Sequence, residues 1–435
     1  MQKAAMAPES IPAVKPANRV RAIFAGTVGN VLEWYDFAIY AFLVPTISKL
    51  FFAEQNQATA VLLTLAVFGS GFVARPLGAI VFGHLGDRYG RRTALSAVMV
   101  LMGVATFCMG LLPTYASVGL LAPILLVLLR LLQGFASGGE WGGSASFVVE
   151  YAEANRRGLF GSLHITGVAA GFLVGAGVIT ILNSLLGADA MLAWGWRIPL
   201  FLGIVVAGIG LWIRRDMDET PTFSRVVQSG EVASAPIKDT FVHNSRAVVE
   251  VFGVTVFHAI SSWVFLVYIV TYLSVVAKLP LGSALAINIW GLVVTLIVTP
   301  LIGYLSDRFG RRPFLIASCV LTVICIIPAF QALNTGDYNK ALMAHCMMTA
   351  IICLYFGPLP ATLVELMPTN VRYSGLSIAY NMAHAILGGF APFIAQLLAT
   401  WTGNPISTTY FVIAGAVVSL IVVLRLRETA FSPLN

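Results

Sequence analysis

Apolar stretches of about 20 residues recur along the whole of this 435-residue chain, with little polar sequence between them. A helix of about 20 apolar residues is long enough to cross the roughly 30 Å hydrocarbon core of a bilayer. With 58% hydrophobic and only 10% charged residues, the chain has too little charge to cover a soluble surface of its size. The sequence therefore predicts an all-α membrane protein.

One short motif occurs twice, and each copy lies between two of the apolar runs. The segment Gly83-His84-Leu85-Gly86-Asp87-Arg88-Tyr89-Gly90-Arg91-Arg92 returns 220 residues later as Gly303-Tyr304-Leu305-Ser306-Asp307-Arg308-Phe309-Gly310-Arg311-Arg312. Internal duplication is the usual construction of secondary transporters. We therefore expect twelve transmembrane helices in two pseudo-symmetric six-helix bundles.

The apolar pattern gives approximate bounds for these helices. They are expected at 20–45, 58–83, 93–113, 118–149, 158–183, 196–214, 246–275, 283–304, 313–333, 339–364, 373–399 and 406–426. The corresponding organisation is a tail over 1–18, a first bundle over 19–214, a linker over 215–245, a second bundle over 246–427 and a short tail over 428–435.

The basic residues are distributed unevenly between the two sets of loops. Of the 26 Lys and Arg residues, 20 fall in the terminal segments and in the loops on their side of the membrane, and four fall in the opposite loops. This is the bias of the positive-inside rule, so both termini are expected in the cytoplasm. The bias accounts for the net charge of +7 without a nucleic-acid partner.

The repeated motif has a physical interpretation as a gate at the cytoplasmic face. Glycines let two helix ends approach closely and allow the turn into the next helix. The aspartates can accept from backbone N–H groups at a neighbouring helix start or pair with an arginine. The predicted gating residues are Gly83, Asp87, Arg88, Gly90 and Arg91 in the first half, and Gly303, Asp307, Arg308, Gly310 and Arg311 in the second.

Ionisable side chains inside the expected helices are candidates for proton coupling, because they are costly to bury in a membrane. Glu33 and Asp36 are three residues apart and share one face of the first helix. Two close carboxylates in a low dielectric tend to retain one proton between them. Arg130 stays protonated and needs an anionic partner, for which Glu33, Asp36, Glu140 and a substrate carboxylate are all open. Glu140 lies among glycines and is a second candidate proton site.

Five longer segments accompany the repeated motif. They are Gly29-Asn30-Val31-Leu32-Glu33-Trp34-Tyr35-Asp36-Phe37, Arg75-Pro76-Leu77-Gly78, the run from Arg130 to Gly143, Trp194-Gly195-Trp196-Arg197-Ile198-Pro199 and Asp218-Glu219-Thr220-Pro221. Together with the repeated motif, these segments resemble the metabolite:proton symporter family of the major facilitator superfamily. The resemblance implies a proton-coupled importer of a small polar metabolite in a bacterial inner membrane, with no cofactor other than the proton. It also associates Arg130 with proton coupling.

Three further segments bear on the substrate. Segments 65–72, 364–368 and 385–392 look closer to citrate carriers, which favours import of a small organic anion such as a di- or tricarboxylate. The second half has no Lys or Arg in the interior of an expected helix, so Arg130 alone would be weak support for a polycarboxylate. A proline or betaine symporter is the alternative, although osmolyte carriers of this family often have a long C-terminal helical tail and this chain stops at Asn435.

Candidate substrate contacts are polar and aromatic residues within the expected helices. They are Arg130, Tyr35, His164, His258, Trp263, Asn381 and His384. A histidine near neutral pH can carry a proton or a hydrogen bond to a carboxylate. Asn381 and His384 are three apart and share a helix face. The expected partners are the solute, the proton and the lipid bilayer, and the chain is expected to be a monomer.

Other function classes have less support in the sequence. A proton antiporter of this superfamily commonly has a Gly-Pro step in helix five, where this chain has Gly171-Phe172. No nucleophile–base set, metal-ligand spacing or phosphate-binding loop is present, so neither an enzyme nor a metal site is expected. A receptor would usually add a soluble signalling domain.

Overall fold

A computed structural model of the chain describes residues 30–31, 34–89, 91–138, 141–215, 244–368, 372–432 and 434. The expected N-terminal tail and nearly all of the expected linker lie outside these residues, as does the start of the first helix. The side chains of 83–89 and 91–95 also lie outside the description.

The described residues form helices almost throughout. The first half contains a helix over residues 34–42, α2 (Val44–Phe51), α3 (Gln57–Tyr89), α4 (Arg91–Leu111), α5 (Tyr115–Val118), α6 (Leu121–Ser137), α7 (Trp141–Tyr151), α8 (Arg157–Ala190), the π-helical turn η1 (Met191–Gly195) and α9 (Arg197–Arg215). The second half contains α12 (Ser245–Trp263), η2 (Val264–Tyr268), α13 (Ile269–Thr271), η3 (Tyr272–Val276), α14 (Leu281–Phe309), α15 (Arg312–Leu333), α16 (Tyr338–Phe356), α17 (Leu359–Leu366), α18 (Arg372–Ala383), η4 (His384–Gly388), α19 (Ala391–Thr402), η5 (Pro405–Ser407) and α20 (Thr408–Arg425).

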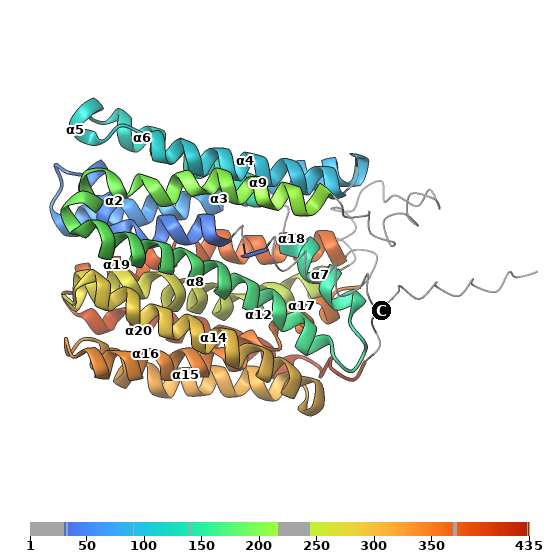
Figure 1. The fold of residues 1–435 in the computed structure, drawn as a ribbon. Coiled ribbons are helices and arrows are strands. Elements are labelled where there is room, and N and C mark those ends of the chain that lie inside the picture. The colour runs from blue at the N-terminus through green and yellow to red at the C-terminus, as the bar shows by residue number, and fades with distance from the viewer. Residues whose placement is uncertain are drawn as a thin grey trace, which may run out of the picture.

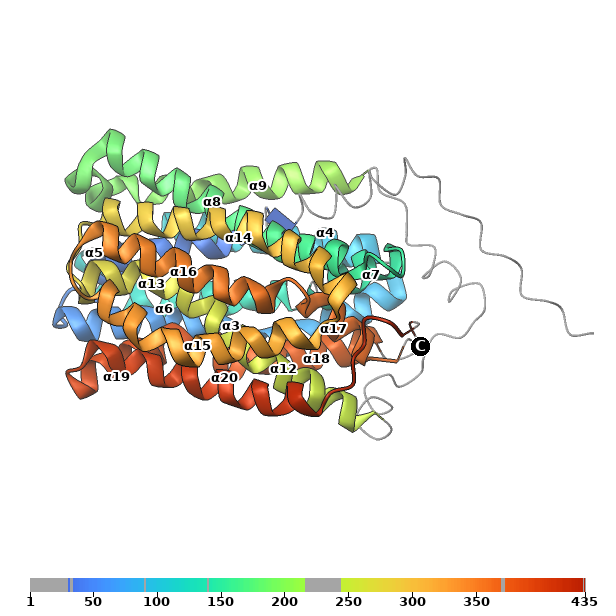
Figure 2. The same ribbon diagram turned by 90° about the horizontal axis from the view of Figure 1, so that it is seen from below.

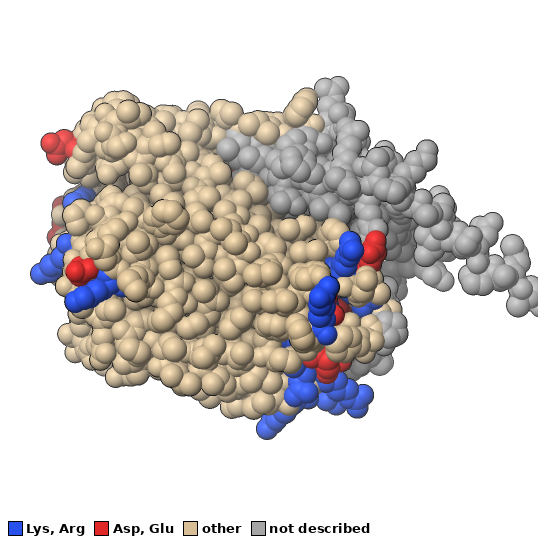
Figure 3. Space-filling model, turned by 60° about the horizontal axis from the view of Figure 1, so that its bottom comes forward, with Lys and Arg blue, Asp and Glu red and all other residues tan. Residues whose placement is uncertain are grey.

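These helices have the length and surface of membrane spans. Eight are long and apolar enough to cross a bilayer, and three shorter apolar helices accompany them in the described part of the chain. The long helices run side by side in both ribbon views (Figures 1 and 2). Charged side chains gather at the two ends of the molecule and leave an uncharged belt between them (Figure 3). The fold is the expected all-α membrane architecture of two helical bundles.

Contacts within and between the halves define the two bundles. In the first half α3 packs on α6 and α4 packs on α9, while in the second half α15 packs on α16 and α12 packs on α20. The most extensive contact between halves joins α8 to α14, and α19 also contacts α3. The interface between the halves therefore lies along α3, α7 and α8 of the first half and along α14 and the segment from α17 to α19 of the second.

Helix ends follow local capping chemistry. The Asn56 side chain accepts a hydrogen bond from the Thr59 N–H (2.9 Å) at the start of α3, and the Asp337 side chain accepts one from the Lys340 N–H (2.9 Å) at the start of α16. Both side chains satisfy first-turn donors that have no partner inside the helix.

Several helix bounds differ from expectation. The helices α3 and α14 continue through Pro76 and Pro300 to Tyr89 and Phe309, so most of each motif copy forms the last turns of a helix. The helix α14 ends only before Gly310, whose φ of 93° is not helical. The expected helix over 118–149 is divided into α6 and α7, and the one over 339–364 is divided at Gly357-Pro358. The helix expected over 373–399 contains the π-helical turn η4.

Candidate transport pathway

A small cavity lies between the halves near the middle of the helices. It is lined by Trp34, Ile165, Val168, Phe172, His258, Ser262, Trp263, Leu266, Phe356, Tyr380 and His384. None of these lining residues is Asp, Glu, Lys or Arg. The space between them is about 20 Å3, enough for one water molecule and far below the roughly 300–1,000 Å3 of small-molecule pockets. A solute therefore needs the halves to separate before it can bind.

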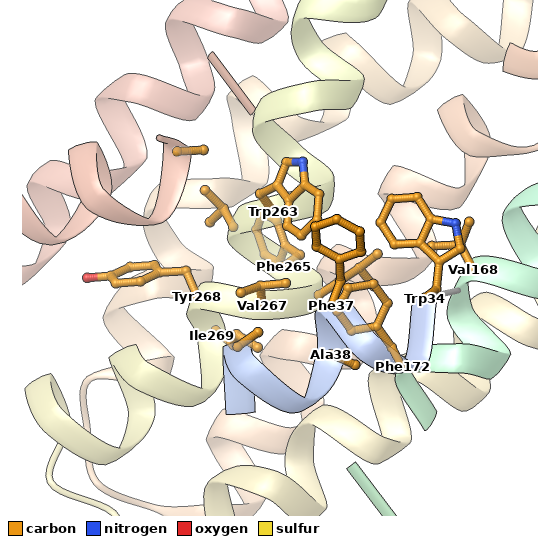
Figure 4. Packing of buried hydrophobic residues seen from close by; sticks show 14 of the residues in the cluster. Trp34, Phe37, Ala38, Val168, Phe172, Trp263, Phe265, Val267, Tyr268 and Ile269 are labelled. Carbon is orange, nitrogen blue, oxygen red and sulfur yellow. The ribbon is translucent and has the colours of Figure 1, made fainter. Parts of the chain in front are cut away.

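Trp263 of the second half closes this cavity by inserting among aromatic rings of the first half (Figure 4). Its ring centroid lies 4.8 Å from that of Phe72, 5.3 Å from Phe68, 5.8 Å from Trp34 and 6.2 Å from Phe172. Tilted and edge-to-face pairs at such distances are favourable beyond simple burial. The aromatic cluster therefore holds the two halves together at the centre of the molecule.

Histidines from both halves gather beside this aromatic cluster. The His258 ring lies 5.4 Å from His384, and the His384 ring stacks on Tyr380 at 4.0 Å. Tyr380 also stacks on Trp141, whose ring meets His164 of the first half at 5.2 Å. The structure thus brings together three of the predicted substrate contacts, His164, His258 and His384, beside a fourth, Trp263.

Asp36 does not face this cavity. Its buried carboxylate lies against the Thr106 side chain of α4, and a Cβ placed on Gly203 of α9 would lie 3.1 Å from its Oδ1. The helical spacing leaves the direction of this face open, and packing turns it toward α4 and α9 within the first bundle. The other predicted carboxylates, Glu33 and Glu140, lie outside the described residues.

Arg130 is fully buried inside the first bundle and is not a cavity residue. Its guanidinium donates to the side-chain oxygen of Gln133 and to the Phe68 carbonyl (3.2 Å), and it lies 4.3 Å from the Tyr40 ring centroid. Gln133 in turn donates to Thr106 (2.9 Å). In the described part of the chain no carboxylate pairs with Arg130. Neutral oxygens and an aromatic face surround the cation, and the anionic partner stays a prediction, because Glu33 and Glu140 lie outside the described residues.

Two other predicted substrate contacts are engaged elsewhere. The Tyr35 hydroxyl donates to the Pro199 carbonyl (3.0 Å) inside the first bundle. The Asn381 amide donates to the Gly138 carbonyl (3.1 Å), which joins the two halves. Neither side chain lines the cavity. In this conformation both side chains bind backbone carbonyls, and their contact with the substrate stays a prediction.

Sequence reasoning missed part of the cavity wall. Trp34 and Phe172 line it, and Arg75 lies behind Trp34 with its guanidinium carbon 5.8 Å from that ring and 4.4 Å from the Phe72 ring. The sequence already identifies Arg75 as an ionisable residue inside the expected helix 58–83. Aromatic residues recur in every helix, so Trp34 and Phe172 carried no distinguishing signal.

At the end of the molecule that carries the second motif copy, Asp307 joins the two halves. Its carboxylate accepts hydrogen bonds from the Gly158 N–H (2.7 Å) and the Leu159 N–H (2.9 Å), in the first turn of α8. These donors have no partner within α8, and the helix dipole favours an anion there. A Cβ on Gly303 would lie 2.6 Å from the Gly158 carbonyl oxygen, so this contact requires glycine.

Arg311 extends this contact into an ion-pair network. Its guanidinium binds Asp307 (2.8 Å) and Glu365 (3.2 Å), and Arg157 of the first half approaches Glu365 at 3.9 Å. Burial lowers the pKa of Arg311, but the two carboxylates outweigh burial and hold the pKa above its usual value. The network of Arg157, Asp307, Arg311 and Glu365 joins α8 of the first half to α14 and α17 of the second. We call these four residues the gate, after the role that the sequence predicts for the motif.

The segment after α20 forms hydrogen bonds with the same gate. Glu428 accepts from the Arg311 N–H (2.8 Å), the Thr429 hydroxyl donates to Glu365 (2.6 Å), and Arg157 donates to the Ser432 carbonyl (3.0 Å).

The two motif copies are not equally described. Gly310 adopts a φ of 93°, the left-handed region that favours glycine, as it turns into α15. Arg308 is exposed and lies over the Tyr304 ring (4.8 Å), so it is not part of the gate. Gly90 lies outside the described residues, and nothing is described of the side chains of Gly83, Asp87, Arg88 and Arg91.

The opposite end of the molecule is hollow. A cavity of about 490 Å3 there is lined by residues of both halves, from α2, the α8–η1 junction and the segment from η3 to the start of α14. Lys49 and Asp189 are its charged lining residues. The end of the molecule that carries the second motif copy, which we call the motif end, is therefore closed between the halves, and the other end is hollow. This is the arrangement expected for one extreme of an alternating-access cycle.

Two helical bundles with a central cavity and a gate at one end define a secondary transporter. The chain belongs to the Major Facilitator Superfamily, whose family model matches residues 27–392 and 284–434. It is 34% identical over 424 residues to the glycine betaine/proline/ectoine/pipecolic acid transporter OusA of Dickeya dadantii (strain 3937), covering 95% of this chain and 84% of the relative.

Other relatives have related names. The proline/betaine transporter of Escherichia coli (strain K12) is 35% identical over 95% of this chain and 85% of its own length, and the inner membrane metabolite transport protein YhjE of the same strain is 35% identical over 95% of both. A solved structure of the xylose transporter XylE from E. coli has a TM-score of 0.78 at 20% identity, covering 96% of this chain and all of that one, which shows the shared fold.

Proposed function

We propose that this transporter is a proton-coupled symporter for a small zwitterion of the betaine and proline class. The observation that carries the proposal is that, in the described part of the chain, no Asp, Glu, Lys or Arg lines the central cavity. The names of the relatives support the same substrate class. The organic-anion reading, which the sequence segments favoured, has less support than its osmolyte alternative.

The electrostatic argument compares a net-neutral solute with a polycarboxylate. An uncompensated charge in a low-dielectric site is costly, so a citrate-like anion needs cationic partners in the wall. Arg130 is engaged inside the first bundle, and Arg75 is the described cation found directly behind the wall. A zwitterion brings its own countercharge and needs at most one such cation.

The aromatic cluster supports recognition of the cationic end. Trp34, Phe172 and Trp263 present rings to the cavity, and Trp is the strongest aromatic partner for a quaternary ammonium. When the halves separate, Trp263 leaves its ring partners, and an ammonium group entering there would replace those contacts.

Alternating access then follows from the two ends of the molecule. We propose that the motif end and both termini face the cytoplasm of a bacterial inner membrane, that a monomer suffices, and that solute and proton enter through the 490 Å3 cavity. Inward release requires the gate between α8 and α14 to open after the opposite end closes.

The test is uptake into proteoliposomes with an inward pH gradient. Glycine betaine and proline should accumulate, and citrate and shikimate should neither accumulate nor compete.

Trp263→Leu should raise the KM for betaine about tenfold, because it removes one ring from the ammonium site. Trp290→Leu is the matched control, since Trp290 lies half-exposed on the outer face of α14. Accumulation of citrate without betaine would overturn the proposal.

A further inference from the structure

The proton-coupling candidates taken from the sequence do not reach the cavity in the described part of the chain, which leaves the proton site open. Asp36 faces α4 and α9, and Arg130 is bound by Gln133 and Phe68. The titratable groups that do line the cavity include two histidines in ring contact, His258 and His384.

The hydrogen bonds of these two imidazoles leave basic nitrogens unused. Nδ1 of His384 lies 3.1 Å from the Tyr380 carbonyl oxygen, which can only accept, so Nδ1 carries the hydrogen and Nε2 is the basic nitrogen. Nδ1 of His258 is buried and has no hydrogen-bond partner in the described part of the chain. Buried polar atoms usually have a partner, so such an atom calls for an explanation.

The backbone around His384 supports a functional role for this residue. His384 is the first residue of the π-helical turn η4, whose Gly389 N–H donates to the His384 carbonyl (2.6 Å). Single π-helical turns within helices occur frequently at functional sites. Gly388 of this turn lies against Trp263, and a Cβ there would be 2.9 Å from the indole ring. The turn therefore places His384 and the Trp263 contact together.

We propose that His258 and His384 bind the coupling proton as a pair, at the same site that receives the carboxylate of the zwitterion. This proposal rests on the proposed function. The proton adds to a nitrogen lone pair of one imidazole and leaves from the same nitrogen, so no other bond changes. Two imidazolium ions in ring contact would repel strongly, so the pair holds one proton at a time.

The neighbouring groups explain why the proton and the solute bind together. Arg75 from α3 interacts electrostatically with His384, His164 from α8 interacts with His258, and Tyr380 contacts both rings. No described carboxylate lies within ion-pairing distance of either imidazole, while Glu33 and Glu140 lie outside the described residues.

An imidazolium beside Arg75 is therefore unfavourable until an anion arrives. The carboxylate of the solute supplies that anion, and the solute is held more tightly once the proton is present. Each ligand raises the affinity for the other by the same factor, which is the condition for symport.

The experiment compares His258→Gln and His384→Gln with His345→Gln in proteoliposomes. His345 is a matched control, because it is also buried with an unpartnered Nδ1 but lies on α16 against Phe265 and is not a cavity residue. The two cavity variants should bind betaine more weakly, because the protonated pair no longer faces its carboxylate. At saturating betaine they should still show counterflow, but gradient-driven accumulation and proton uptake should fall at least about tenfold. His345→Gln should keep all three activities.

Asp36→Asn tests the proposal even if the two cavity variants fail to bind betaine. Asp36→Asn should still take up protons with betaine, because its carboxylate faces away from the cavity. Wild-type proton uptake by both His258→Gln and His384→Gln would overturn the proposal, and so would its loss in an Asp36→Asn variant that still exchanges betaine. Failure of the wild type to exchange betaine or proline would instead overturn the proposed function.

Discussion

At the residue scale, Arg130 shows what a sequence can and cannot say about a buried charge. The sequence identified Arg130 as an ionisable residue inside a helix, and the structure confirms that it is fully buried. Its orientation depends on how α6 packs against α3 and α4, which helical periodicity alone does not give. The same holds for Asp36, whose helix face was predicted but whose neighbours were not.

The Arg130 environment predicts a structural role. Arg130→Lys should lower the Tm of the purified transporter by several degrees, because a lysine cannot bind Gln133 and Phe68 together while lying flat on Tyr40. The KM ratio of betaine to proline should stay unchanged. Arg156→Lys is the control, since Arg156 and its partner Glu153 are each 55% exposed at 3.8 Å and such pairs contribute little. An unchanged Tm together with a weakened affinity for betaine would give Arg130 a substrate role instead.

At the scale of helices, the gate depends on one helix start. The first turn of α8 has free N–H groups, and Asp307 at the end of α14 supplies the anion that satisfies two of them. The motif predicted such a contact, because an aspartate between glycines at a helix end suits this geometry. The participation of Arg157, Glu365 and the residues after α20 could not be predicted, because these residues are far apart in the chain.

The gate predicts a shift in conformation when Asp307 changes. Asp307→Ala should favour molecules open at the motif end, because it removes two charge-assisted hydrogen bonds and leaves Arg311 with one carboxylate, at a cost of about 2–4 kcal/mol. Spin labels at Arg156 and Phe309 should report a larger population of long distances between the halves. Both positions are exposed at the motif end.

Arg308 provides the control within the same motif. It is exposed over Tyr304 and makes no described contact across the halves, so Arg308→Gln should leave the distance distribution unchanged. Equal shifts in both variants would mean that the motif acts through its overall charge and not through the bonds of Asp307.

At the scale of the whole molecule, the duplicated motif and the recurring apolar runs were sufficient to predict two helical bundles in a membrane. The cavity was harder to predict, because its wall is formed by helices of both halves and depends on how two rigid bundles meet. The observed state is sealed at the motif end and hollow at the other, with Trp263 closing the centre. The charge of the cavity wall follows only from that arrangement.

The central claim is that a net-neutral zwitterion and a proton bind together in a cavity whose described lining residues include no Asp, Glu, Lys or Arg. Its most direct test is the current produced when betaine is applied to proteoliposomes on a solid-supported membrane. One zwitterion carried with one proton moves a net positive charge, so the account predicts an inward positive current that grows with an inward proton gradient. A monovalent acid carried with one proton moves no charge. Betaine uptake without current, or with a current indifferent to the proton gradient, would contradict the account.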